Sequence, residues 1–243
     1  MNKLRFLQYT LLVHIRSSPA PFASRAERIK LRAPLIFMPC SVTHDLIQLR
    51  KQLRKQRRQL NRFQQRQAEQ QVLQRLRAWP AYRQAQRIGV YLHAFGEIYT
   101  TKIIELCFAQ GKQVYLPMIC NMNDRLVWVR IQQGQYRHKR FAHHRLGMQE
   151  PMASRGRHVS ELDLLLLPLL ACDRRGTRIG MGGGYYDKTL ASAPTTPLRV
   201  GLCHDFQIVD VPLAREAWDQ PLDALISPHF QYSFQRKFAI YNH

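Results

Sequence analysis

The sequence is poor in acidic residues, in clustered cysteines and in long apolar runs. No stretch approaches the roughly 18 apolar residues that would indicate a membrane-spanning helix. The five cysteines are far apart and form no Cys-x-x-Cys pair, which argues against a disulfide framework or a zinc site and is typical of a reducing cytoplasm. Only 16 Asp and Glu residues oppose 37 Lys and Arg residues, so the formal net charge is +21.

The positive charge is concentrated in two segments. Residues 1–37 carry seven basic and one acidic side chain, and residues 46–87 carry twelve basic and one acidic, so their net charges of +6 and +11 supply 17 of the 21. Such a field favours polyanions, either nucleic acid or a polyglutamylated ligand. A run of charge is nevertheless more often a solvated helix face than a recognition surface.

Residues 1–40 do not resemble part of a folded domain. A basic and apolar start is interrupted by His14 and Arg16, and a stretch rich in Ser, Pro, Ala and Arg follows. We expect either a disordered tail or an extension upstream of a true start at Met38. The predicted organisation is therefore this extension, one domain over residues 41–230 and a C-terminal tail over 231–243.

The rest of the chain alternates between strand and helix patterns. We predict an α/β fold of one domain, with a mostly parallel central sheet, helices on both faces and a long basic N-terminal helix. The strands are expected at 87–93, 112–119, 126–131, 164–170, 197–204 and 224–228, and the helices at 43–77 with a break near Asn61, at 100–111 and at 185–191. Residues 132–160 contain no convincing periodic element.

One face of the first helix carries an apolar stripe, and we expect its basic residues to cover the remaining, solvated surface. Thr43 is a possible N-cap of this helix. The basic residues are Arg50, Lys51, Arg54, Lys55, Arg57, Arg58 and Arg62.

A glycine cluster lies between the most apolar strand, at 164–170, and the helix at 185–191. The cluster comprises Gly180, Gly182, Gly183 and Gly184. Glycines in this position allow the backbone to approach a bound group, and the amides of the following helix can face a phosphate. Arg174, Arg175 and Arg178 add positive charge, and Asp187 offers a hard oxygen ligand for Mg2+.

The glycine spacing matches neither the phosphate-binding loop nor the dinucleotide-binding fingerprint. On the glycines alone, a tight strand-to-helix turn is as good an interpretation as a phosphate site. The whole string is more specific. Arg-Ile-Gly-Met-Gly-Gly-Gly-Tyr-Tyr-Asp at 178–187, preceded by Asp-Arg-Arg-Gly at 173–176, resembles the signature of the 5-formyltetrahydrofolate cyclo-ligase family (5,10-methenyltetrahydrofolate synthetases).

The resemblance covers roughly residues 46–228 and implies an enzyme of one-carbon metabolism. Such an enzyme closes 5-formyltetrahydrofolate to 5,10-methenyltetrahydrofolate with ATP and Mg2+ and releases ADP and phosphate. The implied partners are ATP and the folate, with or without a polyglutamate tail, and no nucleic acid or membrane is required. We expect a cytoplasmic monomer.

The resemblance also implies roles for individual residues. Arg178 and Tyr185 would be catalytic, Asp187 and Asp219 would hold Mg2+, and Glu97 would bind the pterin. The implied ATP-binding residues are Arg50, Arg54, Arg178, Ile179, Gly180, Met181, Gly182, Gly183, Gly184, Tyr185 and Tyr186. The implied folate-binding residues are Leu92, Glu97, Met181, Gly182, Gly183, Gly184 and Tyr185.

Two expected cations are absent from this chain. Leu46 stands where the family's N-terminal motif has Lys, and Gly183 stands where some members have Lys. Arg50, Arg54 or Arg58 could replace the first, and spacing does not choose among them. Because Gly183 supplies no charge, phosphate binding would depend more on Arg174, Arg175 and Arg178.

Several features keep other interpretations open. Either Tyr185 or Tyr186 could be core packing, and His204 and Asp205 could support a site indirectly. The histidine-rich segment at 132–160 lacks the spacing of metal ligands and is better interpreted as a surface or substrate-covering loop. The alternative functions are a basic nucleic-acid-binding protein and a nucleotide- or sugar-phosphate-binding α/β protein without cyclo-ligase activity.

Overall fold

The computed structural model describes residues 42–120, 122–144 and 146–235. All of them belong to one compact unit of the chain. The predictions for residues 1–40, including a start at Met38, lie outside the described residues. Within the described residues, no helix is both long and apolar enough to cross a membrane.

The described elements alternate along the chain as the sequence predicts. The helices are α1 (Val42–Gln59), α2 (Arg62–Ala78), α3 (Pro80–Gln84), α4 (Thr101–Ala109), α5 (Gln133–Arg137), α6 (Tyr185–Leu190) and the 3-10 turns η1 (Val159–Glu161) and η2 (Asp205–Gln207). The strands are β1 (Arg87–Gly89), β2 (Gln113–Cys120), β3 (Arg125–Ile131), β4 (Phe141–His143), β5 (Gln149–Pro151), β6 (Leu164–Pro168), β7 (Ala171–Asp173), β8 (Arg178–Ile179), β9 (Leu198–Leu202), β10 (Ile208–Val209), β11 (Ala224–Ile226) and β12 (Gln231–Ser233).

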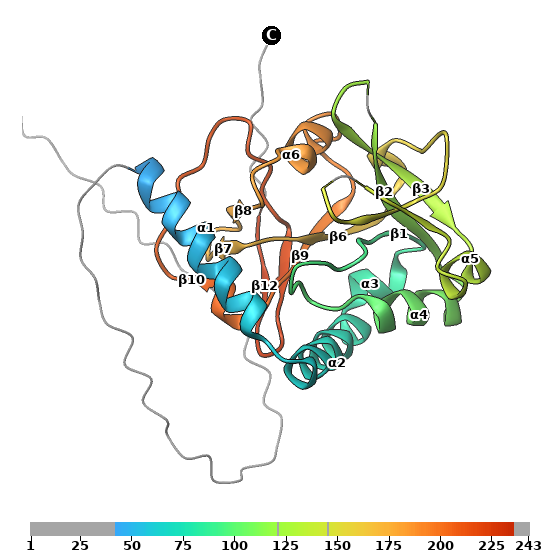
Figure 1. The fold of residues 1–243 in the computed structure, drawn as a ribbon, viewed down its shortest axis with the longest axis horizontal. Helices are drawn as coiled ribbons and strands as arrows, with labels where there is room; N and C mark the ends of the chain where they lie inside the picture. Colours follow the sequence, from blue (N-terminus) through green and yellow to red (C-terminus); the bar gives the residue numbers. More distant parts are fainter. Residues whose placement is uncertain (1–41, 121, 145, 236–243) are drawn as a thin grey trace, which may run out of the picture. The chain divides into compact units, whose positions relative to one another are not determined.

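A seven-stranded sheet forms the centre, in the order β12-β11-β9-β6-β1-β2-β3 (Figure 1). The five inner strands run parallel, and the two edge strands, β3 and β12, pair antiparallel with their neighbours. The unit β1-α4-β2 is the predicted parallel crossover. The predicted α/β class with a mostly parallel sheet is confirmed.

Alternation along the strands divides the core between the two sheet faces. Leu164 and Leu166 of β6 pack into a cluster that includes residues of α2 and α4, and Leu165 and Leu167 pack into a second cluster that includes Leu190 of α6. A strand covered on both faces needs apolar residues at every position, which explains its uninterrupted apolar sequence. Helices therefore cover both faces, as predicted, with α2 and α4 on one side and α6 on the other (Figure 1).

The predicted long helix is two helices. The chain breaks at residues 60–61, where Asn61 caps α2 and forms a reciprocal capping box with Gln64. Thr43 lies inside α1 rather than capping it, because the helix already includes Val42. Leu53 of α1 packs against a small sheet of order β10-β7-β8, which places this helix beside the glycine cluster.

Other boundaries also differ from the prediction. The strand expected at 87–93 ends at Gly89, after which only isolated hydrogen bonds such as that from Val90 N to Tyr115 O continue the pairing. Residues 132–160, expected to lack regular structure, contain α5, the β4–β5 hairpin and η1. The segment expected as a C-terminal tail begins with β12, which is paired to β11.

Candidate functional site

A cavity of about 620 Å³ opens where the parallel strands β1, β2 and β6 end. Its lining comes from α1, the loop after β1, the end of β2, the β4–β5 hairpin, the glycine cluster with α6, and the loop at 214–219. In open α/β sheets, ligands bind at this carboxyl edge. The cavity is therefore the candidate active site.

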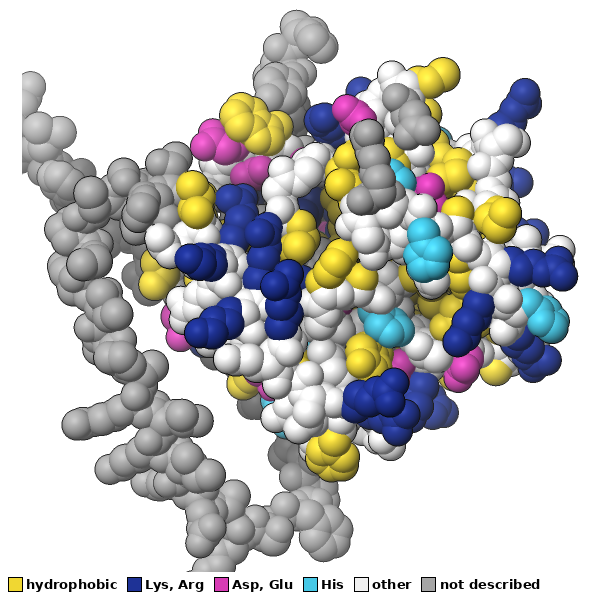
Figure 2. Space-filling view, in the orientation of Figure 1, with side chains coloured by type: hydrophobic (Ala, Val, Ile, Leu, Met, Phe, Trp, Pro, Cys, Tyr) yellow, Lys and Arg dark blue, Asp and Glu magenta, His cyan; other side chains and the backbone are white. Residues whose placement is uncertain are grey.

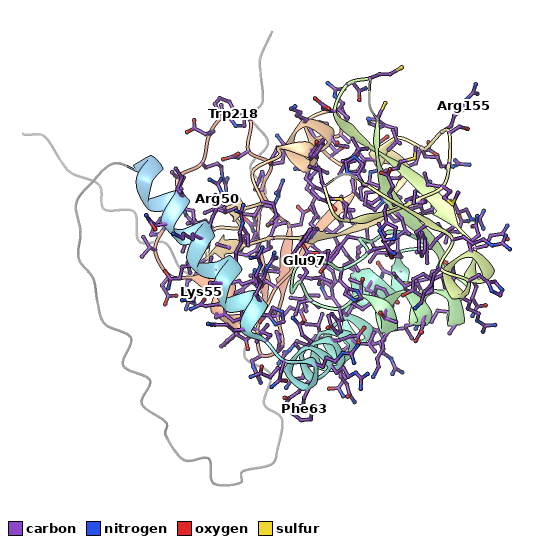
Figure 3. All side chains as sticks on the ribbon, viewed as in Figure 1. Arg50, Lys55, Phe63, Glu97, Arg155 and Trp218 are labelled. Atoms are coloured by element: carbon purple, nitrogen blue, oxygen red, sulfur yellow. The ribbon has the colours of Figure 1, made fainter. Side chains whose placement is uncertain are left out.

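The cavity brings together almost every residue that the sequence predicts for the site. The predicted residues in its lining are Arg50, Leu92, Glu97, Arg178, Ile179, Gly180, Met181, Gly182, Gly183, Gly184, Tyr185, Tyr186, Asp187 and Asp219. Arg54 is not part of the lining, but its Nη2 donates to the backbone oxygen of Met181 at 2.9 Å. Figure 3 labels three of the residues that line the cavity. Arg50 lies on α1, Glu97 lies near the centre of the view, and Trp218 lies above and to the right of the upper end of α1.

The glycine cluster needs its glycines for different reasons. Gly182 and Gly184 have φ angles of +106° and +65°, a conformation that side chains disfavour. A Cβ on Gly183 would lie 2.7 Å from Cε2 of Tyr185, so the Tyr185 ring occupies that space. Among the described residues, the amides of Gly182, Gly183 and Gly184 donate no hydrogen bond, which leaves them available to a ligand.

The predicted catalytic cation and a predicted metal ligand contact each other. Arg178 Nη2 donates to Asp187 Oδ1 at 2.7 Å, and the backbone N of Gln220 donates to the same oxygen at 3.0 Å. The Arg178 side chain is buried, its Nε has no hydrogen-bond partner among the described residues, and its guanidinium lies 5.9 Å from the centre of the Tyr186 ring. A buried donor without a partner is costly, and a bound anion would satisfy it.

The donor set suits a Mg2+ ion that arrives with phosphates. Asp187 and Asp219 both line the cavity, and within the described part of the chain each engages only one carboxylate oxygen: Asp187 uses Oδ1, and Asp219 Oδ2 accepts from Glu216 N at 2.9 Å. No group of three or more potential metal-ligating side chains occurs in the described part of the chain. Mg2+ usually takes one or two carboxylates together with substrate phosphates and water, so these two carboxylates fit it without a complete protein cage.

Glu97 lies deep in the site beside a buried cation. Its Oε1 is 3.7 Å from Nη1 of Arg57, and its Oε2 accepts a hydrogen bond from Ala94 N at 3.0 Å. Burial raises the pKa of Glu97 to about 7, although the Ala94 amide and Arg57 oppose the shift. The expectation that Arg57 lies on the solvated face of its helix is wrong, because only 1% of the residue is exposed.

The loop that carries Glu97 is held from two other elements. Gly96 O lies 3.1 Å from Gln65 Nε2, which donates to it, and 3.1 Å from Nε2 of His204. Burial lowers the pKa of His204 to about 4, so this ring is neutral and serves to support the loop. Asp205 instead binds Ser227 and His229.

The two arginines that follow β7, to which the Lys absent at position 183 was expected to give more weight, lie outside the cavity lining. Arg174 pairs with Asp210, Arg175 pairs with Asp173 and donates to Leu213 O, and neither is part of the cavity lining. The expectation that both would carry extra phosphate-binding weight is therefore wrong. Positive charge reaches the site from α1 instead, over which Figure 2 shows Lys and Arg side chains gathered. Leu46, at the other departure from the family pattern, contributes an apolar side chain to the lining.

Several site residues could not be identified from the sequence. Glu216, Trp218 and the hairpin residues 148–150 line the cavity from segments without a recognisable local motif. Arg57 did leave a signal, because it follows Leu53 by four residues and so falls on the apolar stripe of α1. Both Tyr185 and Tyr186 pack against the core while lining the cavity, so core packing and site membership are not exclusive.

Comparison with known proteins relates this chain to a family of folate enzymes. A sequence model described as the 5-formyltetrahydrofolate cyclo-ligase family matches residues 42–228. The 5-formyltetrahydrofolate cyclo-ligase of Escherichia coli is 36% identical over 172 residues, which cover 68% of this chain and 90% of that protein. The cyclo-ligase of Haemophilus influenzae is 36% identical over 185 residues, covering 72% and 93% respectively.

A solved structure shows the same fold. The NMR structure of Aquifex aeolicus 5,10-methenyltetrahydrofolate synthetase matches with a TM-score of 0.67 and 24% sequence identity. The match covers 82% of this chain and 97% of that chain, so nearly all of the solved protein has a counterpart here.

Proposed function

Because the chain belongs to the 5-formyltetrahydrofolate cyclo-ligase family, we propose that it converts 5-formyltetrahydrofolate to 5,10-methenyltetrahydrofolate, consuming ATP with Mg2+ and releasing ADP and phosphate. One observation carries the proposal: a single cavity is lined by Glu97, by the glycine cluster and by the carboxylates Asp187 and Asp219. A site for this reaction has to hold a folate, the phosphates of ATP and a divalent cation together. The lining has a group suited to each.

The reaction proceeds by activating a poor leaving group. The formyl oxygen attacks the terminal phosphorus of ATP, forming an oxygen–phosphorus bond as the bond to ADP breaks. N10 then attacks the activated carbon and closes the five-membered ring. Loss of the N10 proton and departure of phosphate leave the methenyl product, so each turnover consumes one ATP and releases one ADP and one phosphate.

The protein contributes positioning and charge stabilisation, which dominate catalysis of phosphoryl transfer. We assign the phosphates to the amides of Gly182, Gly183 and Gly184, to Arg178 and to the α1 arginines Arg50 and Arg54. These amides and the Nε atoms of the three arginines have no hydrogen-bond partner among residues 42–120, 122–144 and 146–235, which supports this assignment. Arg178 would stabilise the charge that develops on the transferring phosphoryl group.

Asp187 and Asp219 would hold the divalent ion through their unengaged carboxylate oxygens. When bound, Mg2+ would supply charge neutralisation on the phosphate oxygens. The Arg178–Asp187 contact implies an exchange of partners, because Arg178 gains an anionic phosphate when Asp187 gains the cation. Tyr185, held against Gly183, would orient the reacting groups.

Glu97 and Leu92 are assigned to the folate. A carboxylate accepts two hydrogen bonds side by side, which matches the amino and ring N–H donors of a pterin. Leu92, Met181 and the other apolar residues of the lining would cover the ring system. As part of the same proposal, the enzyme acts as a cytoplasmic monomer and needs no nucleic acid.

Formation of methenyltetrahydrofolate, followed by its absorbance, tests the activity directly. Purified protein is given 5-formyltetrahydrofolate, Mg2+ and ATP, and reactions without ATP or without Mg2+ serve as controls. We expect product only with all components, with equal amounts of ADP and phosphate. Absence of ATP-dependent product would refute the proposal, and salt-sensitive retention of RNA without turnover would favour the nucleic-acid alternative.

A further inference from the structure

Arg57 is a buried arginine with an unusual set of contacts. Only 1% of the residue is exposed, and its guanidinium lies between three segments of the site. Nη1 is 3.7 Å from Glu97 Oε1 and 3.4 Å from Leu169 O, and Nη2 is 3.6 Å from Met181 Sδ. Nε has no hydrogen-bond partner among the described residues. The side chain therefore reaches the loop of Glu97, the residue that follows β6 and the glycine cluster at once, with long contacts to each.

The backbone of Arg57 lies close to the same loop that its side chain contacts. Gly96 has a φ of +78°, and a Cβ built on it would lie 2.5 Å from Arg57 O. Only glycine allows the loop to approach the last turn of α1 this closely. Arg57 thus contacts Glu97 through its side chain and packs closely against Gly96 through its backbone, while Gln65 and His204 bind Gly96 O.

Arg57 is also the cation that acts on Glu97. A guanidinium stays charged in proteins, and burying it without an anion nearby is strongly unfavourable. Within the described residues, Tyr91 after β1 and Tyr186 on α6 also interact with this carboxylate, and His204 after β9 lies against the neighbouring Gly96 O. Burial raises the pKa of both tyrosines and lowers that of His204 to about 4, so all three are neutral near neutral pH.

We propose that Arg57 is a positioning residue for folate binding, which favours the ionised form of Glu97 and holds it toward the cavity while not touching the substrate itself. Arg57 is absent from the cavity lining, whereas Glu97 is part of it, so Arg57 acts through Glu97. This inference rests on the proposed function, because it assumes that Glu97 binds the pterin. It adds a specific consequence: loss of Arg57 impairs the folate site and spares the nucleotide site.

The pH dependence gives the most specific readout. Burial already raises the pKa of Glu97 to about 7, and Arg57 acts against that rise. Folate affinity requires the carboxylate, so in the wild type it weakens as the pH falls through this region. Without Arg57 the pKa of Glu97 rises further, and the weakening begins at a higher pH.

The experiment compares the wild type with Arg57→Met, which keeps the length and apolar stem of the side chain, and with Arg57→Lys, which keeps the charge. Lys55→Met is the matched control, because Lys55 is an exposed cation in the same helix turn. Calorimetric titration with 5-formyltetrahydrofolate and, separately, with Mg·ATP is carried out between about pH 6 and pH 9, where the carboxylate titrates. Steady-state KM and kcat are measured alongside.

We expect Arg57→Met to weaken folate binding by about tenfold or more at neutral pH, the loss typical of a broken charged contact. The midpoint of the pH dependence should move upward, and the Kd for Mg·ATP should stay within about twofold. Arg57→Lys should return the midpoint toward the wild-type value with a smaller, several-fold loss of affinity. In a Glu97→Gln background the pH dependence should vanish, and Arg57→Met should add little.

The inference is overturned if Arg57→Met leaves the folate Kd and its pH midpoint unchanged, or weakens Mg·ATP equally. If Arg57→Met does not fold, the Kd values of Arg57→Lys for the folate and for Mg·ATP test the inference instead. A several-fold loss confined to the folate supports the role, because one ammonium cannot reach all three segments, and no loss or an equal loss for both substrates refutes it. A wild-type protein that shows no ATP-dependent turnover would instead refute the proposed function, which separates the two failures.

Discussion

The two carboxylate oxygens of Asp187 have different surroundings. One of its oxygens accepts hydrogen bonds from Arg178 and Gln220, and the other is unengaged in the described structure. The engaged oxygen fixes the carboxylate, and the free one is suited to a cation. Replacing the carboxylate should therefore affect the nucleotide more than the folate.

We expect Asp187→Ala to abolish turnover, and Asp187→Asn to lower kcat by about 100-fold or more, as is typical when a charge-stabilising group of an active site is lost. Binding of Mg·ATP should weaken, whereas the Kd for 5-formyltetrahydrofolate should stay near the wild-type value. Asp210→Asn is the control, because Asp210 pairs with Arg174 away from the cavity. Unchanged activity in Asp187→Ala would show that the metal assignment is wrong.

Gly183 offers a second test, this time of packing. A methyl group at this position would lie 2.7 Å from Cε2 of Tyr185, so Gly183→Ala should displace the ring and lower kcat. Gly134→Ala is matched to it, because a Cβ on Gly134 meets nothing within 4 Å, and it should leave kcat unchanged. Thermal unfolding of both variants distinguishes a displaced ring from a destabilised fold. Equal activity of the two variants would contradict the assigned role of Tyr185.

The sequence identifies site residues where the chemistry is local along the chain. The string at 178–187 contains glycines, an arginine and a carboxylate within ten positions, and its constituents do line one cavity. Arg57 was placed on the wrong face because arginines are usually solvated, although its position on the apolar stripe pointed inward. Trp218 could not be recognised, since its only neighbouring signal was Asp219 on the same turn.

At the scale of whole elements, α1 has two functions. Leu53 anchors it to the small sheet, and its arginines reach the glycine cluster, where Arg54 binds Met181 O. We expect the double substitution Arg50→Ala/Arg54→Ala to raise the KM for ATP by about tenfold, because each charged contact contributes appreciably to binding. The KM for the folate should change less.

The control for this helix is Lys51→Ala/Lys55→Ala, since both lysines are exposed on the same element. Steady-state kinetics with each substrate varied in turn make the measurement. An equal rise of the KM for ATP in both double variants would show that the helix acts by its overall charge rather than through these two arginines.

The loop at 214–219 allows a spectroscopic test. Trp218 lines the cavity yet is 66% exposed, whereas Trp128 is fully buried. A ligand in the cavity should shield Trp218, so acrylamide quenching of tryptophan fluorescence should decrease when Mg·ATP or 5-formyltetrahydrofolate is added. The ligand-dependent change should be lost in Trp218→Phe. Persistence of the change in that variant would place the ligand's effect at another tryptophan.

Element prediction succeeded where apolar patterns were long and failed where tertiary contacts decide. The apolar run at 164–170 identified the central strand because both of its faces are buried. The short strands β4, β5 and β12 were missed, since three-residue edge strands carry no readable alternation and depend on their partners. The break between α1 and α2 was anticipated near Asn61, where the structure shows a cap.

On the scale of the molecule, the order and direction of the strands determine where the site lies. Residues from Leu46 to Asp219 meet in one cavity because parallel strands deliver their carboxyl ends to one edge of the sheet. The sequence predicted this arrangement through the order of strands and helices. The size of the cavity and the participation of the β4–β5 hairpin depend on packing that no local pattern encodes.

The net charge of +21 leads to a final prediction. Both proposed substrates are anionic, and Lys and Arg side chains gather over α1 beside the site (Figure 2). Added salt shortens the Debye length from about 10 Å at 0.1 M to about 3 Å at 1 M, so attraction from exposed charges is progressively lost. The KM values for ATP and for the folate should both rise with ionic strength, whereas kcat should change little because Arg178 is buried.

A chain that begins at Met38 distinguishes the electrostatic attraction due to residues 1–37 from that due to the cations of α1. It lacks the net charge of +6 carried by residues 1–37, and the family match, which begins at residue 42, remains complete. We expect its kcat to equal that of the full chain and its salt dependence to persist, because the cations of α1 remain. A salt dependence that disappears in the shorter chain would assign the attraction to the first 37 residues. KM values insensitive to salt in both chains would show that exposed charge does not steer the substrates.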